Sequence, residues 1–177
     1  SAVNALVEKI EYTDEVLIQR INTSVYLDRK SDSNIIVEGL KNPSIKLSNC
    51  CTPIPGDKIT GYISKGAGIA VHRSKCNNLN ALDENRHIDV FWGNDTEKQY
   101  TVNLRIIVSN RDNILADIIN SVTSSKGKVI QVAASTNKVL EATIKLKVNI
   151  KNNAELEIII RNLNTIKGVY SIERMMK

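Results

Sequence analysis

Residues 97–177 show the clearest alternation of apolar and polar positions in the chain. Val102, Leu104, Ile106 and Val108 alternate with polar residues, as in a strand with one buried face. The spacing becomes helical over 114–122, alternates again over 128–135 and 140–150 around a turn at 136–138, and is helical over 156–163. A last strand is predicted at 169–174. This βαββαβ order predicts the split-βαβ, ferredoxin-like fold.

The residues at the helix ends agree with these assignments. Gly127 is expected just past the first helix, and Asn152 or Asn153 is expected to cap the second. The plan places both helices on one face of the sheet. The opposite face therefore carries polar and basic side chains.

Residues 33–92 indicate a different architecture, made of short strands separated by Gly and Pro turns. Strands are predicted at 35–38, 45–47, 59–63, 69–72 and 87–92, with a helix over 74–82. Two short helical stretches occupy 3–22, a polar linker covers 30–34, and Gly93–Thr96 marks a boundary. The predicted class is α+β, with a helical linker at 1–32, a small β-rich Cys/His module at 33–92 and the βαββαβ domain at 97–177.

The charge of the chain is divided along the same lines. The net charge is −3 for residues 1–40, +5 for 41–76, −3 for 77–96 and +6 for 97–177. Clustered basic side chains bind nucleic-acid phosphates and release counterions, although many basic clusters are only solvated surface. We predict RNA contacts at Lys46, Lys58, Lys65, Arg73, Lys75, Arg105, Lys145 and Lys147. The sheet positions carry no stacking aromatics, so the phosphate backbone is the expected target.

All three cysteines and one of the two histidines fall within 27 positions. Thiolate and imidazole groups bind structural zinc, so a zinc site is predicted. The predicted ligands are Cys50, Cys51, His72 and Cys76. Adjacent cysteines can reach one ion only if the chain turns there, and Pro53 and Pro55 favour a turn.

Three other interpretations of the cysteines remain open. They could be buried packing residues, because free Cys is often buried. A disulfide is disfavoured by the odd number of cysteines and by the lack of a secretion signal. A catalytic Cys51 or Cys76 would need a third, orienting partner beside His72, and none is apparent. No apolar run is long enough to span a bilayer.

Three blocks of sequence resemble a known family. Residues 34–39, 47–63 (with Cys-Cys-Thr-Pro-Ile-Pro-Gly-Asp at 50–57) and 66–76 resemble the conserved-cysteine, or zinc-finger, module of long Rel/SpoT proteins. These are bacterial enzymes that make and hydrolyse (p)ppGpp in the stringent response. The segment 97–177 resembles their terminal ACT domain. The resemblance implies a cytoplasmic C-terminal fragment that lacks the hydrolase, synthetase and TGS domains. The start at Ser1 instead of Met agrees with the expectation of a piece of a longer protein.

The resemblance implies a non-catalytic regulatory role within a GTP pyrophosphokinase or (p)ppGpp hydrolase. The expected partners are ribosomal RNA, uncharged tRNA and the absent catalytic half. An alternative is an ACT dimer that senses an amino acid without touching RNA. The family's ligand loop corresponds here to Asn110, Arg111, Asp112, Asn113, Ile114 and Leu115.

Two departures from the family pattern bear on these expectations. Asn110 and Asn113 replace the usual Asp and Gly of the ligand loop, which removes a charge and crowds the backbone approach. Amino-acid sensing is therefore ranked below RNA docking. In addition, Lys75 stands where the family commonly has Asp, so any support by that carboxylate is lost.

Overall fold

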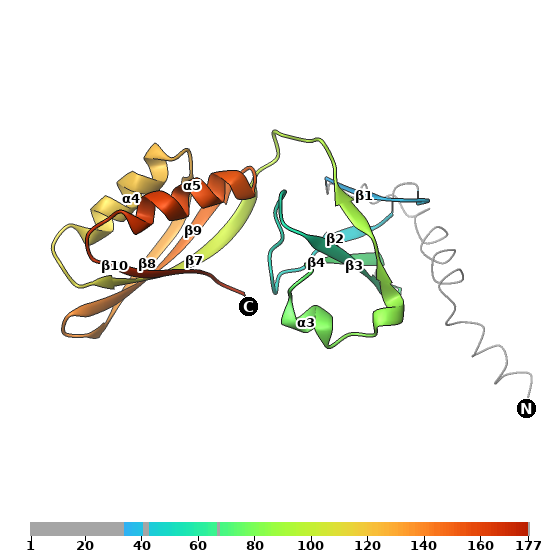
Figure 1. Ribbon diagram of the computed structural model, residues 1–177, viewed down its shortest axis with the longest axis horizontal. Coiled ribbons are helices and arrows are strands. Elements are labelled where there is room, and N and C mark those ends of the chain that lie inside the picture. Colours follow the sequence, from blue (N-terminus) through green and yellow to red (C-terminus); the bar gives the residue numbers. More distant parts are fainter. Residues whose placement is uncertain (1–33, 41–42, 67, 177) are drawn as a thin grey trace, which may run out of the picture. The chain divides into compact units, whose positions relative to one another are not determined.

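The computed structural model describes residues 34–40, 43–66 and 68–176 (Figure 1). The helices predicted at 3–22 lie outside these residues. The chain folds into two compact units. The first unit contains the described residues up to Pro53 together with Lys58–Asp95, and the second contains Ile54–Asp57 and the chain from Thr96 onward. Among the described helices, none has the length and apolar character needed to cross a membrane.

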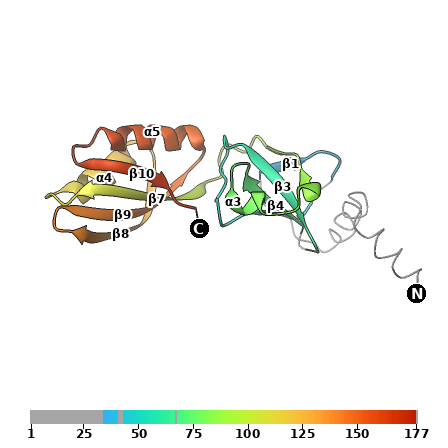
Figure 2. The same cartoon turned by 60° about the horizontal axis from the view of Figure 1, so that its bottom comes forward.

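The second unit has the predicted βαββαβ order. Its elements are β7 (Tyr100–Ser109), α4 (Ile114–Ser124), β8 (Lys128–Lys138), β9 (Glu141–Ile150), α5 (Asn153–Asn164) and β10 (Val169–Arg174). The strands form one antiparallel sheet in the order β10-β7-β9-β8. Helices α4 and α5 cover one face of this sheet, and its other face is open (Figures 1 and 2). The predicted α+β class is confirmed.

The core of this unit lies between the sheet and the helices. Alternate residues of β7 and β9 are buried there, as the sequence pattern requires. Gly127 lies just past the end of α4, as predicted, but it is not the left-handed residue at this helix end. The left-handed residue is Lys126, with φ of 66°. A Cβ on Gly127 would lie 2.8 Å from side-chain atoms of Val122 and Ile159, so the glycine permits close packing.

The hairpin between β8 and β9 turns later than predicted. Lys138 pairs with Glu141, so Val139 and Leu140 form the turn instead of residues 136–138. Both turn residues are largely exposed, at 87% and 78%. A turn at these two residues was not predicted, because both are apolar and turns are recognised in a sequence by residues such as Gly, Asn and Asp.

A tetrapeptide from the Cys-Cys-Thr-Pro-Ile-Pro-Gly-Asp motif at 50–57, Ile54–Asp57, belongs to the second unit. The Asp57 carboxylate binds the Arg174 guanidinium at 2.9 Å, and the two side chains are only 7% and 9% exposed. Asp57 also accepts a hydrogen bond from the backbone N–H of Ile54 at 3.0 Å. The Asn153 N–H, at the start of α5, donates to the Pro55 carbonyl at 2.7 Å. The motif thus has a structural role besides its position next to the cysteines.

The first unit is built from short strands. A four-stranded sheet has the order β2-β4-β3-β5, in which β2 and β4 are parallel and the other pairs antiparallel. A separate antiparallel ribbon pairs β1 with β6. The elements are β1 (Ile35–Val37), β2 (Ile45–Leu47), β3 (Ile59–Ser64), β4 (Gly68–Arg73), α3 (Asn77–Asn80), a 3₁₀ turn (Glu84–Arg86), β5 (His87–Ile88) and β6 (Val90–Trp92). The strand predicted over 87–92 is therefore wrong: it is two strands in different sheets.

Two clusters pack on opposite faces of the four-stranded sheet. One is an apolar core of Val37, Ile63, Ile69, Val71 and Val90. On the other face, Cys51, Cys76 and Leu79 form a smaller cluster, with Cys50 and Tyr62 packed against it. Strand alternation explains the division, because successive side chains of β3 and β4 point to opposite faces.

Candidate metal centre, ligand loop and basic sheet face

A tight turn brings the two adjacent cysteines together. The Thr52 N–H donates to the Ser48 carbonyl at 2.9 Å, which closes one helix-like turn over residues 48–52. Thr52 adopts a left-handed backbone, with φ of 41°. Within such a turn, neighbouring side chains are not forced to opposite sides as they are in a strand. The chain does turn at Cys50 and Cys51, but the turn precedes Pro53 and Pro55.

His72 and Cys76 come from the end of β4 and the segment that follows it. His72 lies on the face of β4 opposite the apolar core and is 7% exposed. Cys76 is the N-cap residue of α3, which has only four residues. The helix predicted over 74–82 is therefore too long. The Cys76 N–H donates to the Arg73 carbonyl at 2.9 Å, so residues 73–76 form a turn before the helix begins.

The four side chains converge as metal ligands do. Cys50 Sγ lies 3.3 Å from His72 Nδ1 and 3.6 Å from Cys76 Sγ, and Cys51 Sγ lies 3.8 Å from His72 Nδ1. All four ligand atoms fall within 4.8 Å of one another. Tetrahedral zinc with thiolate bonds of about 2.3 Å places neighbouring ligand atoms about 3.8 Å apart. The cluster can therefore bind a metal ion, and all three cysteines are free.

The surroundings set the protonation of these ligands in the metal-free protein. Burial raises the pKa of Cys51 to about 12 and also raises the pKa of Cys50. Burial opposes ionisation of Cys76 too, but the Leu79 backbone N–H and the other thiols outweigh it, so the pKa of Cys76 is lowered. The pKa of His72 is lowered by burial and then by the charge of His87. His72 is thus neutral near pH 7, as a metal ligand must be.

Further contacts around the centre were not predicted from the sequence. The Arg73 backbone N–H donates to Cys51 Sγ at 3.2 Å, a contact that favours a thiolate at this position. Tyr62, which packs against the cysteines, carries Arg86 over its ring at 4.9 Å and accepts a hydrogen bond from it at 3.1 Å. His87 meets the same ring edge-on. The sequence did offer one signal for the involvement of His87, because it is the second of the chain's only two histidines.

The predicted basic residues of the first unit are dispersed over several elements. Lys46 lies on β2, Lys58 and Lys65 flank β3, Arg73 ends β4, and Lys75 precedes Cys76. Arg73 is half-buried and the four lysines are exposed. The exposed lysines are therefore accessible to a large anionic partner.

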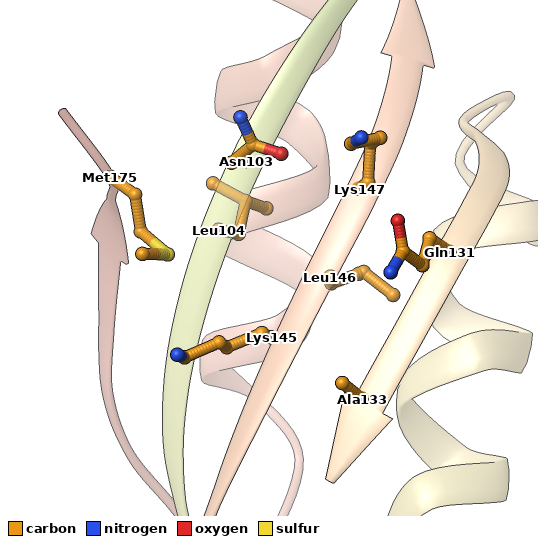
Figure 3. Close-up of a pocket in the computed structure, with 8 residues that line it drawn as sticks. All are labelled: Asn103, Leu104, Gln131, Ala133, Lys145, Leu146, Lys147 and Met175. Atoms are coloured by element: carbon orange, nitrogen blue, oxygen red, sulfur yellow. The ribbon is translucent and has the colours of Figure 1, made fainter. Parts of the chain in front are cut away.

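The predicted basic residues of the second unit lie together on the open sheet face. Arg105 of β7 stands directly opposite Lys145 of β9, and Asn103 stands opposite Lys147. Glu173 of β10 pairs with Arg105 at 3.7 Å. A groove of about 240 Å³ runs across this face (Figure 3). Its lining is Asn103, Leu104, Gln131, Ala133, Lys145, Leu146, Lys147 and Met175.

The loop between β7 and α4 borders a second cavity, of about 270 Å³, with parts of β8 and β9. Asn113 adopts a left-handed backbone with φ of 62°, so this turn tolerates Asn in place of Gly. Arg111 is fully engaged: its guanidinium binds Asp117 at 2.6 Å and the Lys167 carbonyl at 2.9 Å. The Asn110 N–H donates to the Leu140 carbonyl at 3.0 Å. Asn110, Asn113, Ile114 and Leu115 line the cavity, whereas Asp112 does not.

Comparison with known proteins identifies both units. Residues 35–93 match the RelA/SpoT RIS domain family, and residues 96–174 match the ACT domain family. The GTP pyrophosphokinase of Haemophilus influenzae is 32% identical over 175 residues, which cover 93% of this chain and 23% of that protein. The GTP pyrophosphokinase of Escherichia coli strain K12 is 31% identical over 172 residues, with the same coverage.

A relative named for the opposite activity shows the same similarity. The guanosine-3′,5′-bis(diphosphate) 3′-pyrophosphohydrolase of Spiroplasma citri is 30% identical over 167 residues, covering 92% of this chain and 22% of that protein. The chain thus spans less than a quarter of the length of these relatives. Its two matched segments are a RIS domain followed by an ACT domain. The chain belongs to the RelA/SpoT family, and it resembles the C-terminal regulatory part of these enzymes.

Proposed function

We propose that this chain is the non-catalytic regulatory region of a bacterial, cytoplasmic enzyme that synthesises or hydrolyses guanosine polyphosphates. In this proposal it docks onto ribosomal RNA and uncharged tRNA and thereby controls the catalytic half of the same polypeptide. The observation that carries the proposal is the pairing of a RIS and an ACT domain, each with exposed basic side chains. The names of the relatives supply the reaction class.

The electrostatics of the second unit support docking to a phosphate backbone. Arg105 and Lys145 are direct cross-strand neighbours, and like charges in that position repel each other. Glu173, at 3.7 Å from Arg105, offsets part of this repulsion. An anionic partner on the face would relieve the rest. Because none of the residues that line the groove is aromatic, backbone contacts are favoured over base stacking.

Ribosome binding at increasing salt concentration tests the docking proposal. Binding should weaken steeply with salt, because each neutralised phosphate releases counterions. Replacing Lys58 and Lys65 by Glu, or Lys145 and Lys147 by Glu, should each weaken binding and lower the slope by about one per lost phosphate contact. A Lys126→Glu, Lys167→Glu variant makes the same charge change on exposed lysines away from these surfaces.

Three results would contradict docking through these surfaces. They are salt-independent binding, equal loss in the control variant, and full binding by all charge-reversed variants. Metal content should be measured alongside, so that damage to the cysteine cluster is not mistaken for lost RNA contacts.

We further propose that the metal is zinc, held by Cys50, Cys51, His72 and Cys76. Three thiolates and one imidazole are a typical ligand set for structural zinc, and they leave no open coordination position on the ion. When bound, the ion would tie the turn at 48–52 to the end of β4 and the start of α3. Purification without chelator followed by metal analysis should give one zinc per chain. Well-folded protein without metal would contradict this assignment.

The cavity beside the β7–α4 loop supports a second candidate function, amino-acid sensing by an ACT dimer. Its volume of about 270 Å³ suits a small ligand. The polar anchors are weak, however, because Arg111 is committed to Asp117 and to carbonyl groups. Calorimetry with the twenty amino acids tests this function, together with sedimentation for a dimer. A melting-temperature rise at millimolar ligand would support it, and its absence would exclude it.

A further inference from the structure

The groove on the open sheet face has a composition that nonspecific backbone docking does not require. None of its eight lining residues is acidic, and two of them are lysines. Neither Lys145 nor Lys147 has an acidic partner within the part of the chain that the structure describes. Ala133 and Met175 contribute apolar surface. An uncompensated pair of cations beside an apolar surface suits a ligand that has both an anionic and a flat apolar part.

The register of the strands arranges these side chains in two rows. Asn103, Lys147 and Gln131 lie side by side on β7, β9 and β8 and form the first row (Figure 3). Arg105, Lys145 and Ala133 form the second row. The rows are two residues apart along each strand, or about 7 Å. This offset separates the row that contains both carboxamides from the row that contains Arg105 and Lys145.

The first row matches the hydrogen-bonding edges of guanine. An ammonium group only donates, and guanine presents the acceptors O6 and N7, whereas adenine presents an amino donor beside N7. Lys147 therefore favours guanine over adenine. The carboxamides of Asn103 and Gln131 flank Lys147, and each offers an acceptor for the guanine amino group whichever way its amide is turned.

The second row matches a phosphate group. Lys145 is exposed, stands opposite Arg105 and has no acidic partner among the described residues. A phosphate between these two cations would replace their repulsion by two charge-assisted hydrogen bonds. We propose that this groove binds a free phosphorylated guanosine, with its base against Asn103, Lys147 and Gln131 and a phosphate on Lys145. The inference rests on the proposed function, since it makes the regulatory region a sensor of the nucleotides that its own enzyme would handle.

Calorimetry on the full 177-residue chain tests the proposal with GTP, guanosine-3′,5′-bis(diphosphate), ATP and inorganic pyrophosphate. Both guanosine nucleotides should bind saturably, with dissociation constants below about 1 mM. ATP should bind about tenfold more weakly, because its amino group faces Lys147.

Substitutions of the two groove lysines should change nucleotide binding in different ways. Lys145→Gln should weaken all phosphorylated ligands about tenfold, since it removes a charge-assisted bond. Lys147→Gln should instead bring GTP and ATP to similar affinities. Lys167→Gln, a matched charge change on an exposed lysine outside the groove, should leave both affinities unchanged. Lys145 and Lys167 are exposed and Lys147 is half-buried, so amide spectra of each variant would verify that the fold is kept.

Several results would overturn the inference. They are the absence of saturable binding, equal affinity for ATP, and unchanged binding in both groove variants. Binding of a short single-stranded RNA without any binding of free nucleotides would also overturn it. A chain that binds no nucleotide but still binds ribosomes with a steep salt dependence would refute this inference alone. A chain that binds guanosine nucleotides but no ribosomes would refute the docking proposal alone.

Discussion

The two units of this chain reach a folded state by different means. The ACT unit packs two amphipathic helices on a continuous sheet, and alternate residues of β7 and β9 are buried against them. The RIS unit has strands of two to six residues, one small apolar cluster and a set of polarisable side chains on the opposite face. Domains of this size often need a metal or disulfides besides their apolar core. We therefore expect the RIS unit to depend on its Cys/His cluster for stability, and the ACT unit to be stable without a metal.

Removal of one metal ligand should give the largest effect and separate the two units. His72→Ala should abolish tight metal binding and unfold the RIS unit, since structural zinc contributes on the order of 10 kcal/mol to such modules. The ACT unit should stay folded. Trp92, the chain's single tryptophan, lies on β6 of the RIS unit, so its fluorescence reports on that unit alone.

The second histidine provides the matched control for this prediction. His87→Ala removes an imidazole from the same sheet face but no ligand, and it should leave the metal content unchanged. Far-UV circular dichroism would follow the ACT unit separately. If His72→Ala kept native Trp92 fluorescence without metal, the apolar cluster alone would be sufficient for the RIS unit.

The same contrast explains what the sequence could predict. The predicted bounds of strands 45–47 and 169–174 are confirmed to the residue. One-sided burial imposes a period of two on β7 and β9, and this made their alternation readable in the sequence. The break at Asp89, which divides β5 from β6, has no local signal, since it depends on which sheet each strand joins. The sequence could predict the convergence of Cys50, Cys51, His72 and Cys76, because scarce residue types gather within a short stretch. Arg86 was missed, because its contact with Tyr62 spans 24 residues and depends on the register of β3 and β5.

The buried ion pair of the ACT unit should give the next largest effect. Asp57→Ala leaves the Arg174 guanidinium buried without its carboxylate and also removes the acceptor for the Ile54 N–H. Breaking a buried pair from one side typically costs about 3–5 kcal/mol. Urea unfolding followed by circular dichroism should show this loss in the ACT unit, while metal content stays at the wild-type value. A loss below about 1 kcal/mol would show that the pair is solvated in solution.

Metal affinity should depend on pH with a definite sign. The raised pKa values of Cys50 and Cys51 mean that both thiols are protonated near pH 7 in the metal-free protein, and metal binding must displace these protons. His72, whose pKa is lowered, is already neutral and releases none. Affinity should therefore rise with pH across neutrality, by about a hundredfold per pH unit for two protons.

Calorimetry in buffers with different ionisation enthalpies measures the number of protons released. A value near zero at pH 7 would mean that the thiols are already ionised, which would contradict the effect of burial on Cys51. The ACT unit contains no cysteine, so its stability over the same pH range is the internal control.

The smallest effect is expected on the open sheet face of the ACT unit. Glu173 lies 3.7 Å from Arg105, and these side chains are 67% and 44% exposed. Exposed pairs contribute at most about 1 kcal/mol, so Glu173→Gln should shift the urea midpoint only slightly. Its main consequence should be electrostatic: without this carboxylate, the field of Arg105 and Lys145 is less compensated, and polyanion binding should tighten at low salt and depend more steeply on salt. A double variant with Lys145→Gln should return both the affinity and its salt dependence toward the wild-type values.

A stability loss in Glu173→Gln comparable to that of Asp57→Ala would contradict this prediction. It would mean that surface charge, and not the packed apolar face, holds the ACT unit together, and the contrast between the two units would fail.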